Sequence, residues 1–378
     1  MKIAINCSHV QPKGGGAKEA TVNLISNLAQ IDRNNEYIIY VLSDMVDYAK
    51  KVFPGSFRIK TIPFHSGLTG TIKRSLFSQS FWYKEEETEK FDLFHSPFFY
   101  APKFRNARIV MTVHDVRLYR YPQTYKFIRY LYLRHSVKES VQRVDKILAS
   151  SEFTKKELIE LCRALPQKIK VVLLAINKGD YTIRDSEKLN IDSQYNYLRY
   201  NDFILAVGHI EPRKNYERLL KSFELLKNDA RNRNLKLIIV GQPSVDAKQI
   251  IEKINKIDGV IYLNFVSHDM LLWLYNNAKL FVFPSIYEGF GLTPLEAACF
   301  GNICAVSNAS SIPEVCGDGA AYFNPYDIED MKNVISECLY NNDLRNQLQE
   351  KMQKQINKFS WKKHAVETLN VYKELNKK

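Results

Sequence analysis

The sequence predicts an α/β fold with two doubly wound parallel sheets, one in each half of the chain, facing a central cleft. Short apolar runs alternate with helical patterns in both halves. The runs are continuous, as expected for parallel strands that are covered on both faces. A polar stretch without clear periodicity, residues 178–201, separates the two arrays, and 378 residues suffice for two domains.

In the first half, six apolar runs are expected to form strands. The helix expected at 17–31 carries its apolar residues on one stripe. The helix expected at 151–162 begins with Ser151 or Thr154 as a cap candidate. The expected strands lie at 2–6, 37–42, 91–95, 107–115, 146–150 and 169–175.

The alternation restarts after the polar stretch, and the chain is expected to be helical from about residue 327. Ligands of such sheets bind beyond the carboxyl ends of the strands, which places a site in the cleft between the two domains. The expected strands lie at 203–208, 235–241, 260–263, 280–284, 303–306 and 320–323, and the helices between them at 216–227, 246–257 and 268–278.

The net charge of +13 is unevenly spread. Residues 103–146 hold eleven Lys and Arg against three acidic residues, and "RLYRYPQTYKFIRYLYLR" is also aromatic. Such a segment suits the headgroup layer of an anionic membrane, and it would also suit nucleic acid. A solvated basic helix face is the ordinary alternative.

The sequence contains no apolar run long enough to span a bilayer. The start "MKIAIN" reads as a buried strand, and a signal peptide would need a longer apolar stretch. The six cysteines lack C-x-x-C pairing and His partners at zinc spacing. We therefore expect a cytoplasmic protein.

The stretch "YEGFGLTPLEAACFG", residues 287–301, contains two glutamates with seven residues between them. Thr293, Pro294 and Glu296 have the layout of a capping box, with Thr293 as N-cap, and Gly301 would end the short helix. Glu288 has no such explanation. The glycines around it expose backbone N–H groups beside a helix N-terminus, which favours an anion. A nucleotide sugar would satisfy both the anion site and the carboxylate.

The stretch "VGHIEPRKNYERLL" places Arg213 and Lys214 between a strand that ends at Gly208 and a helix that opens near Asn215. Adjacent cations in such a loop are usually surface residues, although the preceding proline stiffens the loop and favours a positioned anion site. His114 closes another apolar strand, at its carboxyl end. Asp115 beside it does not make a metal site, because strand neighbours point to opposite faces.

Gly14, Gly15 and Gly16 join the first strand to the first helix. The run fits neither the dinucleotide fingerprint nor a Walker motif. It still allows close approach of the backbone to a diphosphate or an acceptor.

Together these segments resemble bacterial glycosyltransferases of family 4, which have the two-domain fold called GT-B. "GHIEPRKNYERLL", "FVSHDMLLWLYNNAKLFVFPSIYEGFGLTPLEAACFG" and "SSIPEV" are similar to the donor-binding core of that family. "HSPFFYAP" and "TVHDVRLYRYP" resemble a subgroup rich in O-antigen mannosyltransferases. The resemblance implies an acceptor-binding domain over 1–180, a donor-binding domain over 200–358, and a helix over 359–378 that crosses back to the first domain.

The resemblance also implies roles for residues. Arg213 and Lys214 would hold the diphosphate, His114 would sit over the transferred sugar, and Gly15 and Gly16 would line the diphosphate side of the cleft. The run continues with Ala17-Lys18 instead of the frequent Ile/Ser-Arg, so the match there is approximate.

Glu288 would accept hydrogen bonds from the donor sugar, and Glu296 from the ribose. Phe290, Gly291 and Leu292 would offer backbone N–H groups. Thr293 stands where the family often has proline or another small residue.

The implied reaction is transfer of a sugar with retention of configuration and without a metal or cofactor. The first expectation for the donor is GDP-mannose, with UDP- and dTDP-sugars open. The expected acceptor is a lipid-diphosphate-linked glycan at the anionic inner face of the cytoplasmic membrane. The alternatives are a nucleotide-sugar epimerase of the same fold and a non-enzymatic nucleic-acid-binding protein. The missing fingerprint disfavours an NAD-dependent oxidoreductase.

Overall fold

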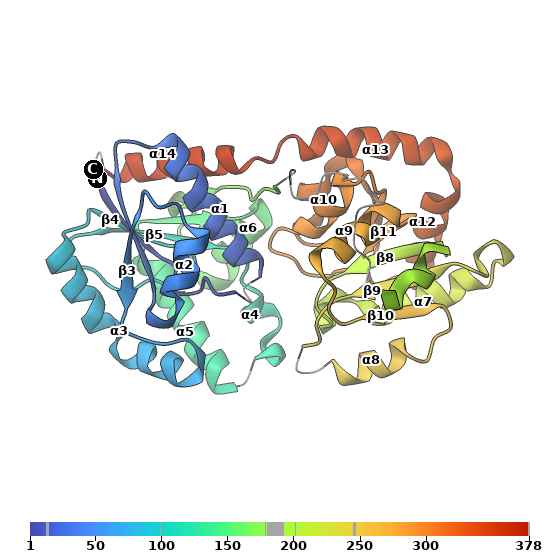
Figure 1. The fold of residues 1–378 in the computed structure, drawn as a ribbon, viewed down its shortest axis with the longest axis horizontal. Coiled ribbons are helices and arrows are strands. Elements are labelled where there is room, and N and C mark those ends of the chain that lie inside the picture. Colours follow the sequence, from blue (N-terminus) through green and yellow to red (C-terminus); the bar gives the residue numbers. More distant parts are fainter. Residues whose placement is uncertain are drawn as a thin grey trace. The chain divides into compact units, whose positions relative to one another are not determined.

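The structure is a computed structural model that describes residues 1–12, 15–98, 100–125, 127–177, 179, 193–200, 202–244 and 247–376. These residues form two compact units (Figure 1). Unit 1 comprises Met1–Ala175 and Ser360–Lys378, and unit 2 comprises Ile176–Phe359. The final segment thus belongs to the first unit. Most of the polar stretch at 178–201 lies outside the described residues, and Ser193–Tyr200 forms the 3-10 helix η6.

Unit 1 is built on a seven-stranded parallel sheet in the order β3-β2-β1-β4-β5-β6-β7. The chain passes from β1 to β2 and β3 on one side and then to β4 on the other side of β1. Ligands of doubly wound sheets bind at such a reversal, beyond the carboxyl ends of the strands. The strands are β1 (Lys2–Asn6), β2 (Glu36–Leu42), β3 (Arg58–Ile62), β4 (Leu93–Ser96), β5 (Arg108–Val113), β6 (Lys146–Ala149) and β7 (Ile169–Val171).

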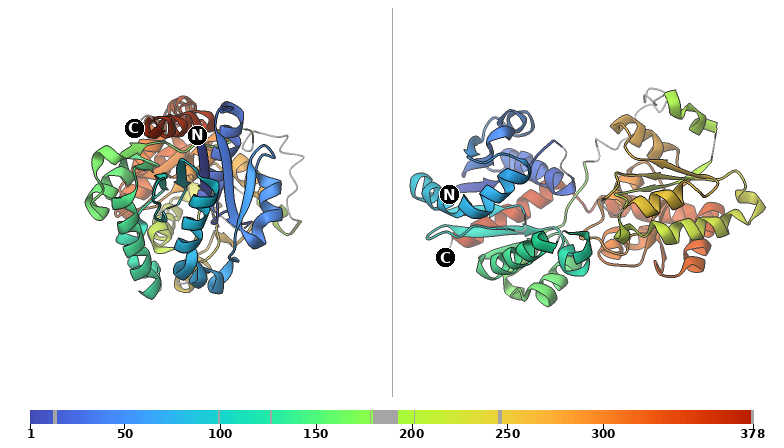
Figure 2. Two further views of the ribbon diagram at one scale, coloured as in Figure 1. Left: turned by 90° about the vertical axis from the view of Figure 1, so that its left-hand side faces the viewer. Right: turned by 90° about the horizontal axis from the view of Figure 1, so that it is seen from below.

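Helices cover both faces of this sheet (Figure 2). α1, α2 and α14 pack on one face, and α3, α5 and α6 on the other. The helices are α1 (Gly16–Ile31), α2 (Val46–Val52), α3 (Gly67–Glu89), α4 (Arg117–Arg120), α5 (Phe127–Arg143), α6 (Glu152–Cys162) and α14 (Trp361–Asn376), with the 3-10 helices η1 (Ser43–Met45), η2 (Pro122–Thr124) and η3 (Pro166–Lys168).

Sequence patterns explain most of these elements. The apolar stripe predicted for α1 is buried, including Leu24 and Leu28. The hydroxyl oxygen of Ser151 accepts a hydrogen bond from the backbone N–H of Thr154, so Ser151 is the N-cap of α6. α14 packs against the sheet of unit 1, where the Tyr372 hydroxyl forms a hydrogen bond of 2.6 Å with Nδ1 of His95, a buried residue of β4.

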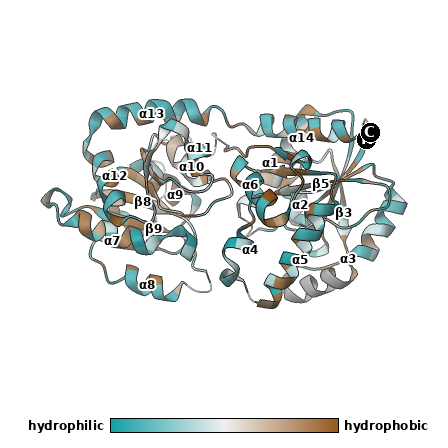
Figure 3. Ribbon diagram, turned by 180° about the vertical axis from the view of Figure 1, so that it is seen from behind, coloured by the Kyte–Doolittle hydropathy of each residue, from teal (hydrophilic) through white to brown (hydrophobic). Residues whose placement is uncertain are grey.

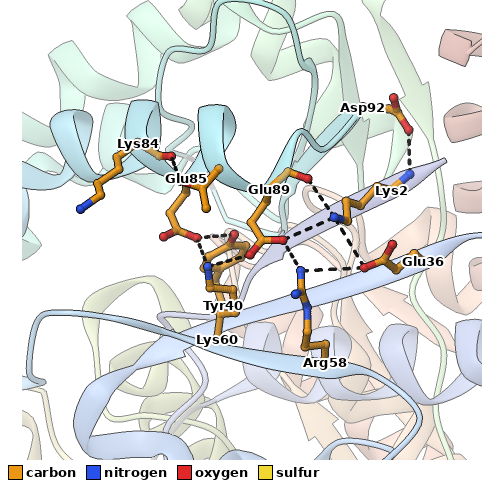
Figure 4. A network of polar contacts seen from close by, with 10 residues as sticks. Lys2, Glu36, Tyr40, Arg58, Lys60, Lys84, Glu85, Glu89 and Asp92 are labelled. Atoms are coloured by element: carbon orange, nitrogen blue, oxygen red, sulfur yellow. Dashed lines mark hydrogen bonds and ion pairs between the residues drawn. The ribbon is translucent and has the colours of Figure 1, made fainter.

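The edge strand β3 is the one strand of this sheet that the sequence pattern did not predict. Two of its five residues, Arg58 and Lys60, are charged, and α3 supplies their partners (Figure 4). Nζ of Lys60 lies 2.6 Å from Glu85 and 2.9 Å from Glu89, and Arg58 pairs with Glu89 as well. Burial opposes ionisation of Glu89, but these cations lower its pKa to about 2. β3 is therefore held at the edge of the sheet by the buried Ile62 together with ion pairs to α3.

Unit 2 contains a six-stranded sheet in the order β10-β9-β8-β11-β12-β13, also parallel. Its reversal point lies at β8, whose two neighbours are β9 and β11. The strands are β8 (Phe203–Val207), β9 (Lys236–Val240), β10 (Val260–Leu263), β11 (Leu280–Phe283), β12 (Cys304–Ser307) and β13 (Ala321–Phe323). All six were predicted.

The helices of unit 2 again cover both faces of its sheet. α7, α8 and α12 pack on one face. α9 packs on the other, where the Tyr275 ring lies 5.9 Å from that of Phe281. The helices are α7 (Tyr216–Lys227), α8 (Lys248–Ile254), α9 (His268–Asn277), α10 (Leu292–Cys299), α11 (Ile312–Cys316), α12 (Ile328–Tyr340) and α13 (Asn342–Ile356), with the 3-10 helices η7 (Pro212–Lys214), η8 (Ala230–Asn232) and η9 (Gly317–Gly319). Among the described helices of the chain, none has the length and apolar character that a bilayer-crossing helix requires.

Candidate active site

The loop after β8 carries two adjacent cations. Arg213 and Lys214 belong to the 3-10 turn η7, and Asn215 follows as the N-cap of α7. Asn215 has the left-handed conformation, with φ 59, which asparagine tolerates better than most residues. Its side-chain Nδ2 donates a hydrogen bond to the carbonyl of Pro325 at 2.7 Å. The loop is therefore fixed, and it lies between strand and helix as predicted.

Two glycines set how closely this loop approaches β9. Gly208 has φ 155, and a Cβ on it would lie 3.2 Å from Cε of Lys214 and from the hydroxyl of Tyr216. A Cβ on Gly241, which follows β9, would overlap the carbonyl group of Gly208. The Tyr216 hydroxyl donates a hydrogen bond to that same carbonyl at 2.9 Å. The backbones meet at this point because neither residue has a side chain.

The two cations meet the carboxylate of Glu288, in the loop that follows β11. Nζ of Lys214 and Nη1 of Arg213 lie 2.6 Å and 2.9 Å from the same oxygen, Oε1 of Glu288. Nη2 of Arg213 lies 2.6 Å from Oε1 of Glu211, and its Nη1 donates to the carbonyl of Tyr287 at 2.7 Å. These four charged side chains are only 8–12% exposed. The resemblance assigns the cations to the diphosphate and Glu288 to the donor sugar, and the structure adds that the three side chains are in direct contact.

The two oxygens of Glu288 differ. Oε1 accepts from both cations and also from the hydroxyl of Ser285 at 2.6 Å. The contacts of this carboxylate with described side chains are all made by Oε1, and none is made by Oε2. Glu288 can therefore hold the cations with one oxygen and offer the other to a ligand hydroxyl.

The charges of the cluster stabilise one another. Burial by itself would raise the pKa of Glu288, but Arg213 and Lys214 lower it to about 2. For Lys214, burial lowers the pKa, and the adjacent Glu288 opposes this effect. Glu288 is therefore ionised at neutral pH, which keeps the two cations at the carboxyl edge of the sheet.

The N-terminus of α10 follows this carboxylate. Gly291 is its N-cap and has the left-handed conformation, with φ 94. The hydroxyl of Ser311 donates to the carbonyls of Glu288 and Phe290 at 2.9 Å and 2.8 Å, which fixes the turn. The side chain of Phe290 is buried. Because the first N–H groups of a helix have no intrahelical partner, those of Leu292 and the next residue are available to an anion.

The predicted capping box is wrong. α10 begins at Leu292, before Thr293, and no side chain caps it. The cause is Gly291, whose left-handed conformation turns the chain into the helix two residues earlier than predicted. The carboxylate of Glu296 instead accepts a hydrogen bond from the hydroxyl of Tyr275 at 3.2 Å. The predicted end is confirmed, since α10 ends at Cys299 and Gly301 is left-handed, with φ 78.

His114 in unit 1 directly follows β5, as predicted. The hydroxyls of Ser150 and Thr154 donate to its backbone carbonyl at 2.7 Å and 3.2 Å. Its two ring nitrogens are covered, yet neither has a hydrogen-bond partner among the described residues. Burial lowers the pKa of the imidazole to about 4, so the ring is neutral at pH 7. Such a ring can donate or accept a hydrogen bond.

Two consecutive segments of the sequence, which together contain the residues of the candidate site, match known protein families. Residues 14–178 match "Glycosyltransferase Family 4", and residues 187–355 match "Glycosyl transferases group 1". This chain is a family 4 glycosyltransferase. Two similar curated relatives are O-antigen chain mannosyltransferase B of Escherichia coli and O-antigen chain mannosyltransferase RfbU of Salmonella typhimurium. The first is 33% identical over 75% of this chain and 74% of the relative, and the second 28% identical over 88% and 90%.

Solved structures establish the fold. Anabaena Alr3699/HepE, crystallised in complex with UDP and glucose, superposes with a TM-score of 0.74 at 14% identity, over 99% of this glycosyltransferase and 100% of that chain. The predicted fold, two parallel sheets of the GT-B type, is confirmed.

Three further histidines of unit 1, which the sequence patterns did not single out, are His9, His95 and His364. Nε2 of His9 bonds to the Thr21 hydroxyl at 2.9 Å, and Nδ1 of His364 to a backbone carbonyl at 2.9 Å. Burial lowers the pKa of His9 and His364 to about 4 and of His95 to about 3. His9 and His95 follow or lie on strands at the carboxyl edge, so the rule that selected His114 could have found them. The described residues contain no group of His, Cys, Asp and Glu placed to hold a metal ion.

Gly15 and Gly16 lie at the start of α1 in the glycosyltransferase, whereas Gly14 lies outside the described residues. Gly15 is the N-cap, with φ −94, a conformation open to any residue. A Cβ on Gly15 or Gly16 would meet nothing within 4 Å. Glycine at these positions is therefore not required by packing or by backbone conformation.

We expect Gly15→Ala to leave the stability of the glycosyltransferase nearly unchanged and to lower kcat/KM. Alanine restricts the unfolded chain, which stabilises by about 0.4–1 kcal/mol, but it is a poorer N-cap than glycine, which offsets this gain. A ligand that contacts the backbone would meet the added methyl group. Thermal unfolding and initial rates measure the two effects. Unchanged kinetics would show that no ligand approaches this turn. Gly241→Ala is the contrasting variant, and it should unfold at a lower temperature because its Cβ would overlap the carbonyl group of Gly208.

Proposed function

We propose that this glycosyltransferase transfers mannose from GDP-mannose to a lipid-linked oligosaccharide during assembly of an O-antigen or similar surface polysaccharide. The observation that carries the proposal is the cluster in which Arg213 and Lys214 share one oxygen of Glu288 beside the N-terminus of α10. The names of both curated relatives support mannose as the sugar.

The donor would bind through its diphosphate and its sugar. The diphosphate would pair with Arg213 and Lys214 and accept hydrogen bonds from the first N–H groups of α10. Oε2 of Glu288 would accept a hydrogen bond from a sugar hydroxyl, since the contacts of this carboxylate with described side chains are made by Oε1. We also propose that Glu296 binds the ribose and that the neutral ring of His114 hydrogen-bonds the transferred sugar.

The proposed reaction retains the anomeric configuration and needs neither a metal nor a cofactor. The bond from C1 to the diphosphate breaks, and the acceptor oxygen bonds to C1 on the same face. The acceptor proton passes to the departing diphosphate oxygen. Negative charge grows on that group in the transition state, and preorganised cations stabilise such charge more than any other single contribution. Because Glu211 and Glu288 fix Arg213 in advance, it needs no rearrangement at that moment.

The acceptor is proposed to be a glycan linked through a diphosphate to a lipid, used at the inner face of the cytoplasmic membrane. The net charge of +13 and the basic excess at residues 103–146 support an anionic surface as partner.

We expect GDP-mannose to raise the unfolding temperature more than UDP- or dTDP-sugars do. A ligand at 100 times its Kd stabilises the native state by about 2.7 kcal/mol, roughly 5–10 °C for a domain of this size. Arg213→Ala should lose most of the shift. Equal shifts with all donors would argue against guanine specificity. Isomerised sugar formed from donor alone would instead indicate an epimerase.

A further inference from the structure

The N-terminal half of α5 is an exposed helix with an apolar surface. No residue from 127 to 135 is buried, and the first buried residue of α5 is Ser136. The exposed apolar side chains are Phe127 (72%), Ile128 (82%), Leu131 (47%) and Tyr132 (42%). Figure 3 shows the hydrophobic colour at the start of this helix. An exposed helix in water would carry polar residues at these positions.

These four side chains form one continuous surface. At 100° per residue, positions 127, 128, 131 and 132 fall within an arc of about 140°. We call this surface the α5 stripe. The opposite face of α5 is buried in its second half, where Val137 and Val141 pack into the core of unit 1. The α5 stripe is therefore directed away from the core, while the second half of α5 is buried against it.

Cations surround the α5 stripe. Arg129, Arg134 and Lys138 are all exposed. The guanidinium of Arg134 lies 5.9 Å from the ring centres of both Tyr119 and Tyr130. Glu139 is the only acidic residue of α5. Aromatic rings and cations around an apolar patch match the headgroup region of a bilayer that contains anionic lipid.

We propose that the α5 stripe inserts into the anionic leaflet of a membrane, with the surrounding arginines and Lys138 against lipid phosphates. A lipid surface fits better than nucleic acid, because the most exposed side chain is the aliphatic Ile128, which neither stacks on bases nor contacts phosphate. Interfacial helices bury such a face by about 5–10 Å. Membrane insertion of the α5 stripe deepens the proposed function, and it rests on that function only for the claim that sugar transfer takes place at the membrane.

The test is binding of the full chain to vesicles without donor or acceptor, so failure of the proposed sugar transfer cannot alter the result. We expect binding to vesicles of phosphatidylcholine and phosphatidylglycerol in equal parts, and weak binding to phosphatidylcholine alone. Phe127→Ser with Ile128→Ser should lower the partition coefficient by at least ~10-fold. Arg129→Gln should lower it ~5-fold, the effect of one cation at an anionic surface.

Leu165→Ser is the matched control, because Leu165 is 52% exposed in the same unit but lies outside α5. It should bind as the wild type does. Circular dichroism and thermal unfolding check that each variant is folded.

A second readout reports insertion directly. The three native tryptophans, Trp82, Trp273 and Trp361, are at most 6% exposed. A tryptophan introduced by Phe127→Trp should therefore be the one quenched by lipids with brominated acyl chains. Wild-type protein that ignores the anionic vesicles overturns the proposal. Vesicle binding that the double serine variant keeps and that high salt abolishes would also overturn it, because electrostatic attraction alone would then explain the binding. An unquenched tryptophan at position 127 would overturn it as well, because the α5 stripe would then not enter the acyl chains.

Discussion

Arg213→Ala is expected to lower the turnover number by more than ~100-fold at saturating donor, the size typical for losing one preorganised donor to a developing anion. In the native site, the guanidinium is held by Glu211, Glu288 and the carbonyl of Tyr287. Its position is thus set before the substrate arrives. Steady-state kinetics with an acceptor in excess measure the effect.

The same substitution leaves two buried carboxylates with fewer partners, so loss of activity must be separated from loss of fold. Arg231→Ala is the matched control. Arg231 also forms a close ion pair in unit 2, 2.6 Å from Asp229, but is 60% exposed. It should turn over normally, because exposed pairs contribute little. Near-normal turnover of folded Arg213→Ala would remove this arginine from the proposed mechanism.

Glu288→Gln is expected to lower both activity and stability. The glutamine side chain has the shape of the glutamate side chain but carries no charge, so Lys214 and Arg213 lose their shared negative partner. Breaking a buried pair from one side costs about 3–5 kcal/mol. Urea unfolding at pH 7 measures the difference. Glu350→Gln, which breaks an exposed pair with Lys354, should cause no measurable change.

The difference in unfolding free energy between the wild type and Glu288→Gln should decrease as the pH is lowered. The pKa of Glu288 is lowered from 4.5 to about 2 in the folded protein. Its ionisation therefore stabilises the fold fully above about pH 4.5, and this contribution is lost as the pH falls towards 2. The gap between wild type and Glu288→Gln should narrow over that range. A gap that stays constant would mean that the carboxylate is not the group responsible.

The sequence predicted both sheets well because their strands are continuous apolar runs. It failed at β3, where Arg58 and Lys60 are stabilised by ion pairs to α3 that no local pattern reveals. For α5 it offered a helix only as one alternative, a solvated basic helix face, because the first half of α5 carries aromatic and basic residues and lacks an amphipathic pattern facing the core.

For the candidate site, the sequence identified Arg213, Lys214 and Glu288 but not their mutual contact, which depends on two loops 74 residues apart along the chain. Ser285 and Glu211 were missed because a serine and an acid beside a proline are common in surface loops. Glu296 was assigned to a cap because its spacing from Thr293 fits one, whereas the conformation of Gly291 sets where the helix begins.

The contact between Gly208 and Gly241 has a consequence for evolution and engineering. A segment from a relative that replaces residues 208–215 can keep its close approach to β9 only if position 241 stays glycine, because a Cβ there would overlap the backbone carbonyl of residue 208. A chimera that imports residues 208–215 together with a non-glycine at 241 should fail. Position 241 is therefore expected to stay glycine even where the cation-bearing segment diverges.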